Sequence, residues 1–135
     1  MAGIDYCTAA LEHRENFSFT KSKVREIIKD INKDYNIGVV LLCTCNRTEI
    51  YISGDKKKTT IDPVTILCKY AGVDFNKYKK FFFIKENEEV AKHLMEVASG
   101  LHSMIFGEDQ IISQVKDAVK VSNEENVSNP ILNTL

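Results

Sequence analysis

The sequence of 135 residues has no tryptophan, only two prolines and six glycines, and no long uninterrupted apolar run. A membrane-spanning helix needs about 20 consecutive apolar residues, so a membrane protein is not predicted. The first residues also lack the charged segment and apolar stretch of a secretory signal peptide. We therefore expect a protein of the cytoplasm with no membrane partner.

An excess of charge of either sign is also missing. The formal net charge is -1, from 18 lysines and arginines against 19 aspartates and glutamates. Overall charge therefore gives no support to nucleic-acid binding, although it does not exclude an RNA partner. The apolar fraction of 44% and charged fraction of 27% are typical of a globular protein. The length suits one domain, or one domain with an appended part.

The sequence has neither the cysteine spacing of a zinc site nor the glycine-rich motif of a dinucleotide-binding site. The four cysteines of a cytoplasmic chain are expected to be reduced thiols, and the spacing of Cys43 and Cys45 is not that of a zinc site. No metal site is predicted. No G-x-G-x-x-G motif follows a predicted strand, so no dinucleotide-binding site is expected within this chain.

The most informative segment is a predicted β-hairpin. An apolar run at 37–42 and an alternating polar and apolar run at 48–53 are joined by a short connection. That connection contains Cys45 and Asn46 and precedes Arg47, and it lacks the Asn-Gly or Asp-Gly pair usual in tight hairpins. A thiol and a cation at a turn suggest a functional site.

Cys45 has two interpretations at this point. The pKa of a free thiol is near ~8.5, and a neighbouring cation lowers it. If the strand begins early enough, Cys45, Arg47 and Glu49 lie on one face, because alternate residues of a strand point the same way. Arg47 would then stabilise the thiolate or bind a substrate carboxylate, with Glu49 orienting it. Alternatively, Cys43 and Cys45 are inert, buried residues at a strand end.

The remaining pattern of residues 1–85 predicts a fold. A weakly alternating segment at 2–8 predicts a first strand, 9–17 a loop or short helical turn, and an apolar stripe within 18–33 a helix. Asp62 and Pro63 start a second helix that Gly72 ends, and the aromatic run at 81–84 predicts a last strand. The order β-α-β-β-α-β predicts an α+β, ferredoxin-like split βαβ antiparallel sheet.

Residues 86–135 predict an appended helical subdomain. Acidic residues at 86–89 favour a helix start, a second helix is expected from about 108, and another would begin near 128. We expect two parts, 1–85 with the Cys45 hairpin and 86–135 completing the site. Because the chain stops as the last helix begins, we expect it to be part of a longer protein.

Two segments resemble a known family. Residues 44–51, TCNRTEIY, resemble the signature of glutamyl-tRNA reductase, the NADPH-dependent first enzyme of five-carbon tetrapyrrole (porphyrin) synthesis. A longer match covers residues 98–111, ASGLHSMIFGEDQI, and continues through 114–116. The opening at 3–6 and the segment 129–133 are also similar to the family.

The resemblance implies a reaction and its residues. In that family a cysteine thiolate attacks the glutamyl ester of glutamyl-tRNA, and the resulting thioester is reduced by NADPH to glutamate-1-semialdehyde. Cys45 matches the nucleophile and His93 a histidine important for activity. The implied substrate-binding residues are Thr44, Asn46, Arg47, Glu49, Ser103, Glu108, Asp109, Gln110 and Gln114.

The resemblance also implies what lies elsewhere. NADPH would bind a domain absent from these residues, and a further absent C-terminal domain would form a homodimer. A downstream aminomutase is a possible partner, and this chain alone would at most acylate Cys45 and hydrolyse the thioester. Three residues depart from the family pattern: His102 stands where Asp is common, Phe106 where Leu is common, and Cys7 where Lys is common.

Two rival hypotheses remain for comparison. One is a non-enzymatic βαββαβ ligand-binding or regulatory module with a structural Cys45, since a fold does not assign a function. The other is a thiol redox protein using Cys43 and Cys45. Residues two apart in extended chain have Cα atoms roughly ~6.5 Å apart, near the upper limit for a disulfide.

Overall fold

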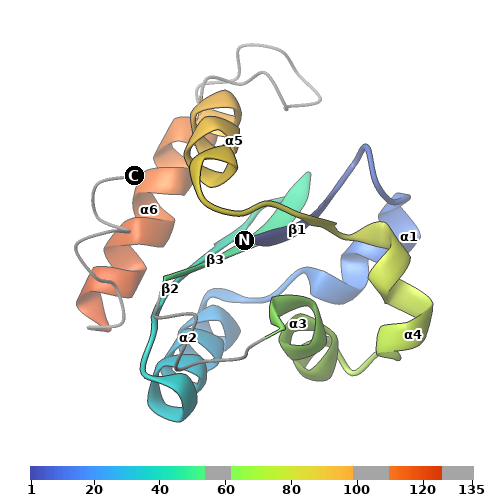
Figure 1. The fold of residues 1–135 in the computed structure, drawn as a ribbon, viewed down its shortest axis with the longest axis horizontal. Helices are drawn as coiled ribbons and strands as arrows, with labels where there is room; N and C mark the ends of the chain where they lie inside the picture. Colours follow the sequence, from blue (N-terminus) through green and yellow to red (C-terminus); the bar gives the residue numbers. More distant parts are fainter. Residues whose placement is uncertain (54–61, 99–109, 126–135) are drawn as a thin grey trace.

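The computed structural model describes residues 1–53, 62–98 and 110–125, and these form a sheet with helices on both faces (Figure 1). The strands are β1 (Ala2–Asp5), β2 (Gly38–Cys43), β3 (Arg47–Ser53) and β4 (Phe83–Ile84). The helices are α1 (Leu11–Arg14), α2 (Lys21–Tyr35), α3 (Pro63–Ala71), α4 (Phe75–Tyr78), α5 (Glu88–Ala98) and α6 (Gln110–Glu124), with 3₁₀ turns η1 (Glu15–Phe17) and η2 (Lys79–Phe81).

The sheet has the strand order β2-β3-β1-β4, and every neighbouring pair is antiparallel. The predicted hairpin is confirmed, with Leu42 opposite Glu49 in its register. Strand β3 also pairs with β1, which places Asp5 opposite Arg47. The α+β class and the antiparallel sheet predicted from the sequence are therefore confirmed.

Two predicted strands are shorter in the structure than the sequence pattern indicated. The first strand was predicted over 2–8 but ends at Asp5, because the Asp5 side chain accepts hydrogen bonds from the backbone N–H groups of Cys7 and Thr8 and starts a turn. The last strand was predicted over 81–84 but contains only 83–84, because Phe81 closes η2 and its ring stacks on His13.

The helices that cover the first face begin and end at strong local signals. Thr20 caps the start of helix α2, with its side chain accepting a hydrogen bond from the N–H of Lys23, and Asn36 in the left-handed conformation caps its end. Asp62 caps the start of helix α3 and Gly72 caps its end, as predicted. The apolar residues of these helices pack against one face of the sheet and form a single core with it. This core contains Ile27, Ile28, Ile31, Val39, Leu41, Ile50, Val64 and Leu67.

Helices α5 and α6 cover the opposite face of the sheet (Figure 1). Their core residues Leu94 and Val97 pack with Val40, Leu42 and Tyr51 of the hairpin. Alternation along β2 explains both cores, because Val39 and Leu41 face one layer while Val40 and Leu42 face the other. The helix expected near residue 128 lies outside the described residues.

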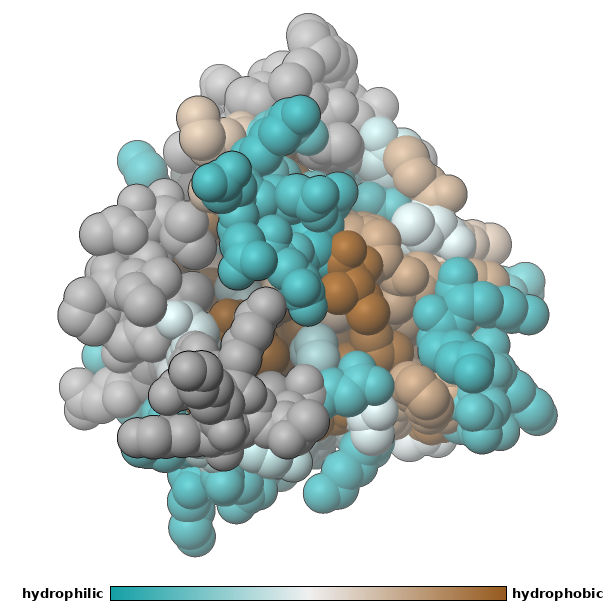
Figure 2. All heavy atoms as spheres, in the orientation of Figure 1, coloured by the Kyte–Doolittle hydropathy of each residue, from teal (hydrophilic) through white to brown (hydrophobic). Residues whose placement is uncertain are grey.

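The surface agrees with this layered packing. Figure 2 shows apolar side chains gathered near the middle of one face, with hydrophilic side chains above and to the right of them. Ile84 of the edge strand β4 is 60% exposed. None of the helices in the described ranges combines the length and the apolar character needed to cross a bilayer.

Candidate functional site

The hairpin apex is closed by a threonine hydroxyl. The Oγ1 atom of Thr44 accepts hydrogen bonds from the backbone N–H groups of Asn46 and Arg47, each at 3.2 Å. The N–H of Thr44 donates to the carbonyl oxygen of Arg47 at 2.8 Å. These bonds supply the turn geometry that Asn-Gly supplies in ordinary hairpins. The apex residue Cys45 is therefore not needed for the turn itself.

Cys45 is exposed, and its backbone is held from two sides. The guanidinium of Arg14 donates from Nη1 to the carbonyl oxygen of Cys45 at 3.0 Å. The N–H of Tyr6 donates to the carbonyl oxygen of Asn46 at 3.1 Å. Cys45 is therefore exposed, while hydrogen bonds from Arg14 and Tyr6 hold the backbone of the apex in place.

Cys43 differs from Cys45 in its surroundings. Its thiol is partly buried, donates to the carbonyl oxygen of Phe17 at 3.4 Å and lies 3.6 Å from the hydroxyl of Thr48. Both cysteines are free thiols in this structure. The two cysteines therefore lie in different surroundings, with Cys43 partly buried and Cys45 exposed.

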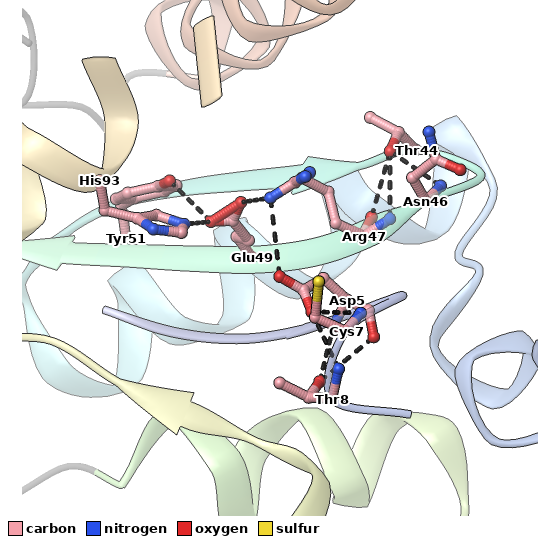
Figure 3. A network of polar contacts seen from close by, with 9 residues as sticks. All are labelled: Asp5, Cys7, Thr8, Thr44, Asn46, Arg47, Glu49, Tyr51 and His93. Carbon is pink, nitrogen blue, oxygen red and sulfur yellow. Dashed lines mark hydrogen bonds and ion pairs between the residues drawn. The ribbon is translucent and has the colours of Figure 1, made fainter. Parts of the chain in front are cut away.

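A buried group of charged side chains lies beside the apex (Figure 3). Arg47, 2% exposed, donates from Nη1 to Oε1 of Glu49 at 3.2 Å and lies 3.9 Å from Oδ2 of Asp5. Of the three residues predicted to share a strand face, Arg47 and Glu49 do so, but Cys45 does not. Cys45 lies in the turn, because β3 begins only at Arg47.

Helix α5 brings His93 to the other end of this group. The Nε2 atom of His93 lies 2.6 Å from Oε2 of Glu49, and the hydroxyl of Tyr51 donates to the same oxygen at 3.0 Å. Figure 3 shows His93 and the apex residues Thr44 and Asn46 at opposite ends of the Arg47–Glu49 pair. We call Asp5, Arg47, Glu49, Tyr51 and His93 the polar cluster.

Phe83 on the edge strand β4 packs against the polar cluster across Gly3, which lies in β1 between Phe83 and Glu49. The ring of Phe83 lies 5.1 Å from the ring of His93, measured between centroids. A Cβ atom on Gly3 would come within 2.6 Å of Phe83 Cζ and 3.0 Å of Glu49 Cγ. A larger residue at this position would therefore force the Phe83 ring or the Glu49 side chain to move.

The charges of the cluster follow from these contacts. Burial acts to raise the pKa of the Glu49 carboxyl, but the hydrogen bond and charge of His93, with Arg47 and Tyr51, outweigh it and lower that pKa overall. Burial, followed by the Glu49 charge, raises the pKa of the Tyr51 hydroxyl. Glu49 is therefore an ionised acceptor at neutral pH, and Tyr51 remains a hydroxyl donor.

The other residues expected at the site divide into two groups. Gln110 is the first residue of α6, and Gln114 lies half-buried about one turn later. Ser103, Glu108 and Asp109, together with the departures His102 and Phe106, lie outside the described residues.

Sequence reasoning missed Asp5, Tyr51 and Arg14. Alternation with Glu49 could have indicated Tyr51, and strand pairing could have indicated Asp5. No local signal connects Arg14 to an apex 31 residues away. Within the described residues, no group of three or more His, Cys, Asp or Glu side chains could hold a metal ion.

The fold and site define an α+β domain that carries an exposed cysteine on a β-hairpin, next to a buried cluster of ion-pairing side chains. Comparison with known proteins gives its family. A family model described as "Glutamyl-tRNAGlu reductase, N-terminal domain" matches residues 2–135. The chain belongs to the glutamyl-tRNA reductase N-terminal domain family, and the resemblance stated from the sequence is confirmed.

Similar proteins and a solved structure support the same family assignment. A glutamyl-tRNA reductase of Alkaliphilus oremlandii is 47% identical over 136 residues, covering 100% of this chain and 40% of that protein. A probable multifunctional siroheme biosynthesis protein of Ruminiclostridium josui is 45% identical, covering 99% of this chain and 26% of that protein. The structure of glutamyl-tRNA reductase from Methanopyrus kandleri matches with a TM-score of 0.75 and 31% identity, covering 97% of this chain and 29% of that one.

The chain therefore spans less than half the length of these relatives. Their names describe reductases of glutamyl-tRNA and a protein of siroheme biosynthesis. These relatives support the reductase hypothesis over the non-enzymatic module.

Proposed function

We propose that this chain is the catalytic domain of a glutamyl-tRNA reductase, with Cys45 as its nucleophile. The Cys45 thiolate forms a C–S bond to the ester carbonyl carbon of glutamate, the C–O bond to the terminal ribose breaks, and that ribose oxygen takes up a proton. The observation that supports this proposal is the exposed thiol on a backbone held by Thr44, Tyr6 and Arg14. Covalent catalysis by a thiolate divides one difficult step into two.

Arg47 is suited to bind the side-chain carboxylate of the glutamyl group. A guanidinium has five N–H donors in a fixed plane and pairs well with carboxylates, as its Nη1 contacts with Glu49 and Asp5 illustrate. Anchoring by two carboxylates orients the group before substrate arrives. Further substrate contacts are proposed for Thr44, Asn46, Ser103, Glu108, Asp109, Gln110 and Gln114.

His93 is proposed to assist the reaction as an acid/base or orienting group, held by Glu49. NADPH supplies the hydride that reduces the thioester. The residues of this chain contain no dinucleotide-binding motif, so NADPH is proposed to bind another part of the complete polypeptide.

Several finer points belong to the same proposal. We propose that residues 1–85 form a ferredoxin-like split βαβ unit and that residues 86–135 complete the site. Glutamyl-tRNA is the proposed substrate in the cytoplasm, and a homodimer and a downstream aminomutase are proposed partners.

Intact-mass spectrometry of the complete native polypeptide tests the proposed nucleophile. After brief incubation with glutamyl-tRNA without NADPH, we expect a glutamyl adduct on the wild type and none on Cys45→Ser. Cys7→Ser is the matched control, because Cys7 is also an exposed thiol, and it should keep the adduct. An adduct on Cys45→Ser, or none on the wild type, would refute the proposal.

A further inference from the structure

Glu49 occupies the centre of the polar cluster, and its role differs from that of a substrate contact. We propose that Glu49 is a positioning residue that fixes the ring tautomer of His93 while it anchors Arg47. The inference rests on the proposed function, because His93 and Arg47 are the groups that it would prepare for the acylation step. It assigns to Glu49 a role within the protein instead of the substrate contact that the resemblance implied.

Both carboxylate oxygens of Glu49 are engaged inside the protein. Oε1 accepts from Arg47, and Oε2 accepts from Tyr51 and contacts His93. Glu49 is 0% exposed, and the Phe83 ring on the edge strand packs against His93 and lies across Gly3 from Glu49. A substrate group could reach the carboxylate only by displacing these neighbours.

The contact with His93 determines where its proton lies. An ionised carboxylate can only accept hydrogen bonds, so the His93 nitrogen 2.6 Å from Glu49 must carry a hydrogen. When the ring is neutral, Nε2 is then the protonated nitrogen and Nδ1 carries the lone pair. Glu49 therefore selects Nδ1 as the nitrogen of His93 that can accept a proton.

The substitution Glu49→Gln tests this role, because an amide has one accepting oxygen and one donating nitrogen and should therefore change the tautomer of His93. Arg47 has no acceptor, so the amide oxygen must face Arg47. The amide nitrogen then faces His93 and Tyr51, and both can accept a hydrogen bond. Facing this new donor, His93 must become an acceptor at Nε2 and move its hydrogen to Nδ1.

Nitrogen NMR of the complete native polypeptide, labelled with ¹⁵N-histidine, reads the tautomer directly. The sequence has three histidines, and the His93 signals are those lost in His93→Gln. At a pH high enough to make the ring neutral, we expect the Nε2–H form in the wild type and the Nδ1–H form in Glu49→Gln. Two controls, Tyr51→Phe and Glu89→Gln on the exposed start of α5, should keep the wild-type form.

Single-turnover acylation of Cys45 by glutamyl-tRNA gives the second readout. We expect Glu49→Gln to slow the maximal rate by about 10²-fold, the low end for loss of a general acid or base, while the half-saturating concentration changes little. Arg47→Lys should do the reverse, raising the half-saturating concentration with the His93 tautomer unchanged. Glu49→Asp is expected to restore part of the rate, since it retains a carboxylate.

Three results would overturn the proposal: an Nδ1–H tautomer in the wild type, an unchanged tautomer in a folded Glu49→Gln, or a Glu49→Gln defect confined to the half-saturating concentration. If Glu49→Gln does not fold, the wild-type spectrum still decides the first point. The spectrum requires no tRNA. Absence of wild-type acylation would therefore refute the proposed function and leave the positioning role to be judged by the tautomer.

Discussion

Replacing Gly3 with alanine places one methyl group in the tightest contact of the site. The added Cβ would lie 2.6 Å from Cζ of Phe83 and 3.0 Å from Cγ of Glu49. Ordinary carbon contacts are about 3.5–4.0 Å, so the Phe83 ring must move by roughly 1 Å. Glu49 has less room to move, because its carboxylate is held by three neighbours.

The loss of stability caused by Gly3→Ala depends on whether the Phe83 ring or the Glu49 side chain moves to accommodate the methyl group. Inserting a methyl group into a packed region typically costs about 1–3 kcal/mol. The Phe83 ring is only half-buried, and β4 pairs with β1 at only two positions, so the ring can shift. We therefore expect Gly3→Ala to lower the free energy of unfolding by about 1–2 kcal/mol.

Urea denaturation of the wild type, Gly3→Ala, Phe83→Leu and the double variant measures this contact. Leucine removes the ring atom that the new methyl group meets, so the cost of Gly3→Ala should fall by about 1 kcal/mol in the Phe83→Leu background. Gly72→Ala is a contrasting control, since nothing lies within 4 Å of its added Cβ and its φ of 71° makes the cost one of backbone strain. That cost should not depend on Phe83. Equal costs of Gly3→Ala in both backgrounds would refute the steric argument.

Two further predictions concern the hairpin and the buried carboxylate. Thr44→Val removes the acceptor of two backbone N–H groups at the apex, so we expect a loss of about 1–2 kcal/mol in urea denaturation. Thr44→Ser should remain close to the wild type, and equal stability of the two variants would contradict this role. Because the folded state lowers the pKa of Glu49, its contribution to stability is present above the unfolded value of about 4.3 and is lost as pH falls through the folded pKa. The stability of Glu49→Gln should therefore depend less on pH in that acidic range, and parallel pH curves would contradict the assignment.

Local patterns in the sequence determined the elements of this fold. Asp62 with Pro63 at one end and Gly72 at the other bound α3 correctly, because capping acts over neighbouring residues. The alternation of residues 48–53 predicted the second hairpin strand, because a strand repeats every two residues. The motif around Cys45, together with the longer match at 98–111, indicated the family.

Tertiary structure decided which of these residues meet. His93 and Glu49 are 44 residues apart, and only the packing of α5 on the sheet brings their side chains together. Packing also separated Cys43, whose thiol contacts Phe17, from the exposed Cys45. The aromatic run at 81–84 shows the limit of local propensity, because the stacking of Phe81 on His13 leaves only two residues for β4. A residue's neighbours in sequence determine its local conformation, but the contacts that form a site arise from elements whose positions depend on the whole core.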